Sequence, residues 1–253
     1  MGESRHNPDQ LLKATQADEE NRNKGHLKIF FGYAAGVGKT YAMLEAAHME
    51  KQQGIDVVAG YVEPHARPKT AALLNGLEVL PTREVFYNGM ILDEFDIGMA
   101  LKRKPQLILV DELAHTNAEG CRHAKRYQDI KELLNAGIDV YTTVNVQHIE
   151  SLCDTVASIT EIVVRERIPD SIFDNADQVE LIDIEPQDLI NRLNTGNVYR
   201  QTQAKQAVEN FFTIENLTAL REIAELFGKL GGQRKNGMGH ALIIGMGVRK
   251  SSP

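Results

Sequence analysis

The amino-acid sequence predicts an α/β fold built on a mainly parallel sheet, with helices on both faces and a C-terminal helical segment. Short apolar runs rich in Val, Ile and Leu alternate along the chain with longer segments of helical spacing. Such alternation is typical of parallel sheets covered by crossover helices. The hydrophobic share of 42% and the charged share of 25% are those of a globular domain.

The strand predictions depend on short apolar or β-branched runs that end at Gly, Pro or an acidic residue. The clearest are the run stopped by Gly32 and the run that leads into Asp111. The predicted strands, in chain order, are 27–31, 55–62, 85–87, 106–111, 138–144, 162–164 and 179–184.

The helix predictions depend on good helix formers at helical spacing, with a glycine placed to end the helix. Gly54 and Gly137 are the clearest such endings. The predicted helices are 39–53, 69–75, 93–102, 127–135, 149–157, 188–193 and 203–230.

The chain divides by composition into three parts. Residues 1–26 are polar and predict a mobile tail, because they contain too little apolar surface to order themselves. Residues 27–230 carry the alternating pattern and predict a single domain. The glycine-rich, polar stretch 231–237 predicts a linker.

Charge and cysteine content restrict the function classes. A net charge of -7 argues against general nucleic-acid binding, which needs a basic face. The two cysteines, Cys121 and Cys153, favour a reducing cytoplasmic setting. No apolar run approaches the roughly 20 residues of a membrane helix, so we expect no membrane insertion in this chain.

A glycine-rich loop follows the first predicted strand and precedes the first predicted helix. Small residues there let backbone N–H groups converge on phosphate oxygens, and the helix N-terminus favours negative charge. This context predicts a fold of P-loop NTPase type, although Tyr33 stands where the usual pattern has its first glycine. The predicted nucleotide-binding residues are Gly32, Ala35, Gly36, Val37, Gly38, Lys39, Thr40 and Tyr41.

Two acidic residues end the most apolar strand. In P-loop proteins an acid at such a strand end holds Mg²⁺, which predicts Asp111 and the Thr40 hydroxyl as magnesium ligands. The adjacent Glu112 is placed to polarise an attacking water, and Lys39 to contact the β and γ phosphates. The predicted catalytic residues are therefore Glu112 and Lys39, and the other reading of the pair is solvated acids at a strand end.

Polar residues after other strands are candidates for sensing the nucleotide state. Each has a plain structural alternative, namely a turn, a polar loop cap or a helix cap. These candidates are Glu63, His65, His115, Asn117, Asn145 and Gln147. The basic cluster at 122–126 is either the solvated start of a helix or the source of an arginine finger.

Four motifs occur in an order that resembles a known family. They lie at residues 32–40, 60–65, 110–117 and 142–152, and their sequences are GYAAGVGKT, GYVEPH, VDELAHTN and TTVNVQHIESL. Together they resemble the N-terminal cytoplasmic domain of KdpD, the osmosensitive potassium-channel sensor histidine kinase, over roughly residues 25–228. The resemblance implies ATP binding with Mg²⁺, and control of potassium uptake through a response regulator and other sensor-kinase domains.

The resemblance also implies what the rest of the chain is. Residues 240–247 resemble the opening strand of a universal-stress-protein-like domain, so 231–253 is expected to be a linker and the first strand of a truncated domain. Family members continue into membrane helices and a histidine kinase core, which this sequence lacks. We therefore expect a regulatory ATP-binding domain with slow hydrolysis. The alternatives are a P-loop phosphotransferase, such as a serine or nucleoside kinase, and a non-catalytic docking scaffold.

Overall fold

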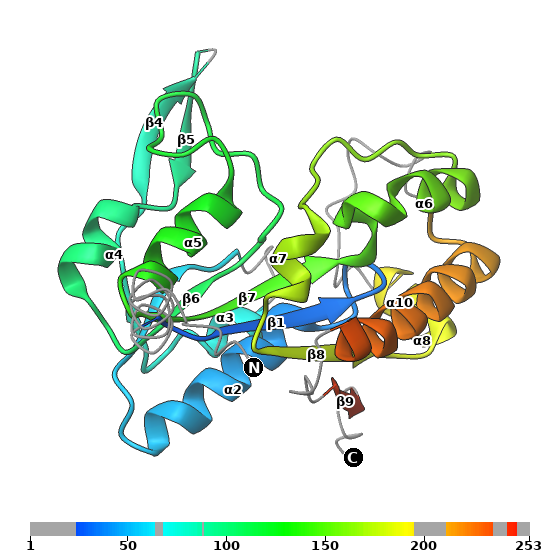
Figure 1. Ribbon diagram of the computed structural model, residues 1–253, viewed down its shortest axis with the longest axis horizontal. Helices are drawn as coiled ribbons and strands as arrows, with labels where there is room; N and C mark the ends of the chain where they lie inside the picture. Colours follow the sequence, from blue (N-terminus) through cyan, green and yellow to red (C-terminus); the bar gives the residue numbers. More distant parts are fainter. Residues whose placement is uncertain (1–23, 64–67, 88, 195–210, 235–241, 247–253) are drawn as a thin grey trace, which may run out of the picture.

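The computed structural model describes residues 24–63, 68–87, 89–194, 211–234 and 242–246 (Figure 1). Within these ranges the main sheet has seven strands in the order β3-β2-β6-β7-β1-β8-β9. Every pairing between neighbouring strands is parallel, which confirms the α/β prediction. The strands are β1 (Leu27–Gly32), β2 (Val57–Tyr61), β3 (Glu78–Val79), β6 (Leu107–Val110), β7 (Asp139–Asn145), β8 (Gln178–Asp183) and β9 (Leu242–Met246).

Burial on both faces explains why the central strands are apolar at nearly every position. All four residues of β6 are buried, and so are Ile29, Phe30 and Phe31 of β1. A parallel strand covered on both faces has no solvent side, so its sequence shows a continuous apolar run instead of alternation. The side chains of the apolar runs that predicted these strands therefore form the centre of the hydrophobic core.

Helices cover both faces of the sheet. In Figure 1, α2 lies on one side of the strands, whereas α4 and α5 lie on the other. The C-terminal helix α10 packs against β8 and α8. Its presence confirms the prediction of a C-terminal helical segment. The helices are α2 (Lys39–Gln52), α3 (Pro68–Ala72), α4 (Ile97–Arg103), α5 (Arg126–Asn135), α6 (Cys153–Thr160), α7 (Asp170–Asp174), α8 (Pro186–Asn194) and α10 (Ile214–Arg234).

A two-stranded antiparallel hairpin projects from the main sheet (Figure 1). It consists of β4 (Arg83–Tyr87) and β5 (Met90–Glu94). The prediction of a helix starting at residue 93 was wrong, because residues 93 and 94 belong to the β4–β5 ladder. The helix α4 begins only at Ile97, where the Asp96 side chain accepts a hydrogen bond from the Met99 N–H at 3.0 Å.

Two further predictions on the second half of the chain were wrong. Residues 162–164 form no strand, and Val163 is 70% exposed, so this short apolar run is not part of the core. The helix expected from residue 149 begins at Cys153, after the 3-10 turns Val146–His148 and Glu150–Leu152. Residues 1–23 of the predicted tail at 1–26 and residues 203–210 of the predicted helix at 203–230 lie outside the described residues, and α10 covers most of the remainder of that helix.

The described ends of the domain are joined to its core. The Gly25 N–H donates to the Leu134 carbonyl at 2.8 Å, so the chain is already packed before β1 begins. Strand β9 pairs in parallel with β8 and so extends the same sheet. Among the described helices, none has both the length and the apolar character that crossing a bilayer requires.

Candidate functional site

The glycine-rich loop at 32–40 turns sharply between the end of β1 and the start of α2. Gly36 and Gly38 have φ angles of 92° and 114°, in the region that only glycine enters without strain. A Cβ on Gly32 would lie 2.7 Å from the Val37 Cγ2, so this position also needs glycine. The loop therefore folds tightly over the N-terminus of α2, whose first residue is Lys39.

Tyr33 anchors the entry of this loop. Its side chain is fully buried, and its hydroxyl donates a hydrogen bond to the Ile184 carbonyl at 3.0 Å. Burial, with the nearby charge of Asp183, raises the pKa of Tyr33 well above its usual range. The residue that departs from the usual glycine pattern thus ties the loop to the end of β8.

Lys39, Thr40 and Asp111 come together at the carboxyl edge of the sheet. The Lys39 Nζ donates to the Ala34 carbonyl at 3.1 Å, which folds the side chain back over the loop. The Thr40 hydroxyl donates to the Asp111 Oδ2 at 3.0 Å. The Thr143 hydroxyl, from β7, donates to the other carboxylate oxygen of Asp111. Three segments far apart in sequence therefore converge on one carboxylate.

The Asp111 carboxylate is held in a setting that opposes its charge. Its side chain is buried, and this burial raises its pKa, as does the neighbouring charge of Glu112. Hydrogen bonds from Thr143 and Thr40, and the charge of Lys39, lower the pKa but do not offset the burial. A buried carboxylate beside a hydroxyl is an oxygen donor set of the kind that Mg²⁺ prefers, and a cation would relieve the cost of the buried charge.

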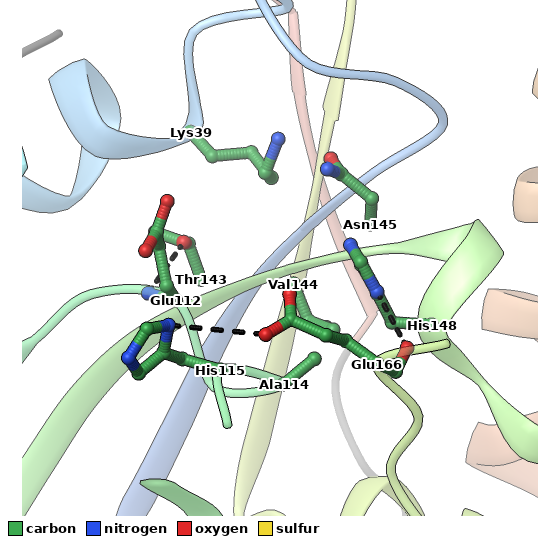
Figure 2. Close-up of a pocket in the computed structure, with 9 residues that line it drawn as sticks. All are labelled: Lys39, Glu112, Ala114, His115, Thr143, Val144, Asn145, His148 and Glu166. Atoms are coloured by element: carbon green, nitrogen blue, oxygen red, sulfur yellow. Dashed lines mark hydrogen bonds and ion pairs between the residues drawn. The ribbon is translucent and has the colours of Figure 1, made fainter. Parts of the chain in front are cut away.

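Glu112 has a strained backbone. Its φ angle is 59°, in the left-handed region that a residue with a side chain seldom enters. Such a conformation costs about 1–3 kcal/mol and is found most often at functional sites. The Glu112 N–H donates to the Asp111 Oδ1 at 3.1 Å, which helps to hold the turn. Figure 2 shows the Glu112 side chain lining the same pocket as the Lys39 ammonium group.

A cavity of about 80 Å³ lies between these residues and the end of β7 (Figure 2). His148 lies in its wall, where its Nδ1 contacts the Glu166 carbonyl at 2.8 Å. Burial lowers the pKa of His148, so its ring is neutral at physiological pH. The residues that line the cavity are Lys39, Glu112, Ala114, His115, Thr143, Val144, Asn145, His148 and Glu166.

The cavity includes some of the predicted sensing residues and not others. His115 and Asn145 line it, and the Asn145 Oδ1 is a buried acceptor with no hydrogen-bond partner among the described residues. The Gln147 Oε1 is a second such acceptor, although Gln147 is not in the cavity lining. Asn117 instead donates to the Asp129 carboxylate at 2.6 Å, so its side chain is bound within the following loop and helix.

The remaining predicted residues occupy the loop or the end of β2. Glu63 lies two residues after the end of β2 at Tyr61, whereas His65 lies outside the described residues. Val37 is fully buried beneath the loop, and Ala35 and Tyr41 are partly exposed. Thus the loop residues, Asp111, Glu112, His115 and Asn145 share one site, and Asn117 does not.

Sequence reasoning missed a buried ion pair behind this site. Arg126 is fully buried and donates to the Glu94 Oε2 at 3.0 Å and to the Asp111 carbonyl at 3.3 Å. Its guanidinium also lies 4.2 Å from the centre of the Tyr61 ring. Arg126 is therefore neither a solvated helix start nor a finger in contact with the cavity. No signal in the sequence separated it from its basic neighbours.

Thr143 was also missed, but for this residue the sequence carried a signal. Thr142 and Thr143 are polar residues in the middle of a strand, between Tyr141 and Val144, and such residues need a partner when they are buried. A search for polar residues within predicted buried strands would have marked Thr143 as a residue that needs a partner, although not Asp111 as that partner.

The fold and the site define an α/β protein whose candidate site lies at the carboxyl ends of parallel strands, the edge at which open α/β sheets bind their ligands. The family model described as "Osmosensitive K+ channel His kinase sensor domain" matches residues 23–227. That match covers most of the chain, so the protein belongs to the KdpD sensor domain family.

Curated relatives of this family are similar over the same region. The chain is 61% identical over 220 residues to a protein named "Sensor protein KdpD" from Clostridium acetobutylicum. It is 56% identical over 220 residues to the protein of that name from Escherichia coli, and 53% identical over 204 residues to the one from Mycobacterium tuberculosis. These regions make up 87%, 87% and 81% of the chain, but 24% of each relative. The chain thus spans about a quarter of the length of these relatives.

Proposed function

We propose that this chain is a regulatory domain of P-loop NTPase type that binds ATP and Mg²⁺ within a KdpD-type sensor kinase controlling potassium uptake. The contact between Thr40 and Asp111 carries the proposal, because the hydroxyl and the carboxylate meet at 3.0 Å beside Lys39. Membership of the KdpD sensor domain family supports the regulatory role.

The glycine-rich loop would hold the phosphates. The left-handed turns at Gly36 and Gly38 allow successive N–H groups to point to one side, and the N-terminus of α2 adds its dipole. Lys39 would exchange its hydrogen bond with the Ala34 carbonyl for contacts with the β and γ phosphates. The loop requires little rearrangement, since Tyr33 fixes its entry.

Thr40 and Asp111 would hold the magnesium ion. When bound, Mg²⁺ neutralises phosphate charge and orients the phosphate oxygens. The buried carboxylate of Asp111, with its raised pKa, gains most from a nearby cation, because burial is the main cost of its negative charge. Thr143 would keep the carboxylate in place through the other oxygen.

Glu112 would accept the proton of an attacking water. Its side chain lines the cavity that also contains Lys39, and the cavity of about 80 Å³ has the size for water and not for a bulky acceptor. His115 and Asn145, in the same lining, would contact this water or the terminal phosphate. Slow hydrolysis would then reset the regulatory state.

The proposed partners are the other domains of the sensor kinase and a response regulator. Two observations support a role in a larger protein. The relatives named "Sensor protein KdpD" are about four times longer than the matched region, since it covers 24% of each. The chain also belongs to a family described as a sensor domain.

A P-loop phosphotransferase is the second candidate, and one observation favours it. A larger cavity of about 580 Å³ lies between the β4–β5 hairpin and the loop at 115–124. Both cavities share His115 in their linings, so an acceptor in the larger one would lie next to the proposed phosphate site. Its volume is within the range of small-molecule pockets.

Product analysis with γ-labelled ATP and Mg²⁺ tests the proposal. We expect the wild-type chain to release labelled inorganic phosphate slowly, and Glu112→Gln to bind ATP but release phosphate far more slowly than the wild type. Label that appears on the protein, or on an added serine or nucleoside acceptor, would favour the phosphotransferase. A folded chain that neither binds nor cleaves ATP would contradict both, and would favour a non-catalytic docking scaffold.

A further inference from the structure

The β4–β5 hairpin has one face that nothing in the described structure covers. Phe86 and Ile91 are directly paired across the two strands, and these residues are 75% and 64% exposed. Directly paired residues of an antiparallel ladder lie on the same face. Phe86 and Ile91 therefore form one exposed apolar pair on a hairpin that projects from the molecule (Figure 1).

An acidic pair borders this apolar pair. Glu84 and Asp93 are the next directly paired residues on the same face, and both are exposed. Like charges in this position destabilise a two-stranded ladder. No cation among the described residues forms an ion pair with either carboxylate. We call these four residues, Glu84, Phe86, Ile91 and Asp93, the outer hairpin face.

The opposite face of the hairpin is anchored to the domain. Val85 is buried, and the Glu94 carboxylate at the base accepts a hydrogen bond from the Ala118 N–H at 2.8 Å and from Arg126 at 3.0 Å. Tyr87 and Leu92 line the larger cavity against the loop at 115–124. The outer hairpin face is thus held in a fixed position, which lowers the entropic cost of binding a partner.

We propose that the outer hairpin face is a docking surface for a protein segment in which apolar side chains are bordered by Lys or Arg. Phe86 and Ile91 would be covered by the apolar side chains, and the basic residues would neutralise Glu84 and Asp93. The charge pattern selects this partner over two others. An anionic lipid surface would meet the acidic pair with the same sign of charge. A second copy of the outer hairpin face would place two more carboxylates against Glu84 and Asp93, and these like charges would repel.

Peptide binding tests this surface. The probe is a fluorescein-labelled amphipathic helical peptide with a leucine stripe bordered by lysines, and its counterpart has glutamates in place of the lysines. We expect the lysine peptide to bind at least tenfold more tightly than the glutamate peptide. The double variant Phe86→Ser/Ile91→Ser should weaken binding about tenfold or more, as the loss of two apolar anchors does. Glu84→Gln/Asp93→Asn should weaken it and reduce its salt dependence.

The control is Met49→Ser, which removes a similarly exposed apolar side chain (56%) from α2 and should leave binding unchanged. Lys39→Ala should also leave it unchanged, so the result is independent of nucleotide binding. Equal binding of the two peptides, or undiminished binding by the Phe86→Ser/Ile91→Ser variant, would overturn the proposal. It would equally be overturned if that variant lost binding to anionic phosphatidylserine vesicles, or lost self-association in sedimentation, while lysine-peptide binding remained.

Discussion

Arg126 and Glu94 form an ion pair that is almost completely removed from solvent, with side-chain exposures of 0% and 5%. Arg126 also donates a hydrogen bond to the carbonyl of Asp111, so the pair connects the base of the β4–β5 hairpin with the end of β6. Burial raises the pKa of Glu94, but hydrogen bonds from His115 and the Ala118 N–H, together with the charges of His115 and Arg126, hold this pKa below its usual value. The hairpin and the candidate site are therefore one connected structure.

Removing one member of this pair is expected to destabilise the protein strongly. Arg126→Met leaves the Glu94 carboxylate buried without its cation, which costs about 3–5 kcal/mol in the free energy of unfolding. Urea denaturation followed by circular dichroism measures this change. The matched control is Arg122→Met, because Arg122 is 54% exposed and its pair with Glu132 should contribute less than about 1 kcal/mol. Equal effects of the two substitutions would contradict the structural role of Arg126.

Asp111→Asn is expected to stabilise the nucleotide-free protein at neutral pH. Because the folded state raises the pKa of Asp111, the folded protein binds this proton more tightly than the unfolded chain. The contribution of Asp111 to stability is thus full below its unfolded pKa of about 3.9 and is lost as pH rises through the folded pKa. A neutral Asn side chain has no charge to bury, so Asp111→Asn avoids this loss of stability as the pH rises.

Thermal unfolding at several pH values measures this effect. A gain of ~1 kcal/mol would raise the Tm of Asp111→Asn by about 2–4 °C at neutral pH. The difference between Asp111→Asn and the wild type should shrink as the pH is lowered toward 4. A lower Tm of the variant at every pH would show that the carboxylate stabilises the fold, contrary to this account.

The two threonines that contact Asp111 are expected to differ in how their substitution changes the Mg²⁺ dependence of nucleotide binding. Thr40→Val removes the proposed magnesium ligand, so nucleotide affinity should lose its dependence on Mg²⁺ while binding without the metal persists. Thr143→Val removes the other hydroxyl on Asp111 but leaves Thr40 in place, so the magnesium dependence should remain. Titrations of a fluorescent ATP analogue with and without Mg²⁺ compare the two. If both variants lost the Mg²⁺ dependence of nucleotide affinity to the same extent, this would argue against a specific role for Thr40.

Glu112→Gln is expected to separate binding from catalysis. The change removes the proposed base and keeps the size of the side chain, so phosphate release should fall by about 10²–10⁴-fold while ATP affinity stays nearly constant. Phosphate release under single-turnover conditions measures the chemical step. Release at the wild-type rate would remove Glu112 from the mechanism.

The local elements that depend on burial could be predicted from the sequence. The apolar runs at β1 and β6 and the glycine-rich loop are local signals, and the structure has a strand at each run and the sharp turn between β1 and α2. The hairpin was only half predicted, because Met90, Ile91 and Leu92 form a strand whose apolar side chains are mostly exposed. Periodicity alone does not distinguish such a strand from the start of a helix.

The contacts that join distant segments were harder to predict. The strand order places β7 between β1 and β6, and this brings Thr143 against Asp111 although 32 residues separate them. The burial of Arg126 depends on Glu94, which lies on a strand that the sequence did not predict. Asn117 was a reasonable candidate by position, but its loop turns it toward Asp129. These outcomes depend on tertiary packing and not on local propensity.

The central claim is that the glycine-rich loop binds the phosphates of ATP through Lys39. Isothermal titration calorimetry of ATP and Mg²⁺ into the wild-type chain, Lys39→Ala and Lys51→Ala tests it most directly. Lys51 is an exposed lysine in the last turn of the same helix and serves as the matched control. The account predicts that wild type and Lys51→Ala bind alike and that Lys39→Ala binds at least tenfold more weakly. Undiminished binding by Lys39→Ala, or no binding by folded wild-type protein, would contradict it.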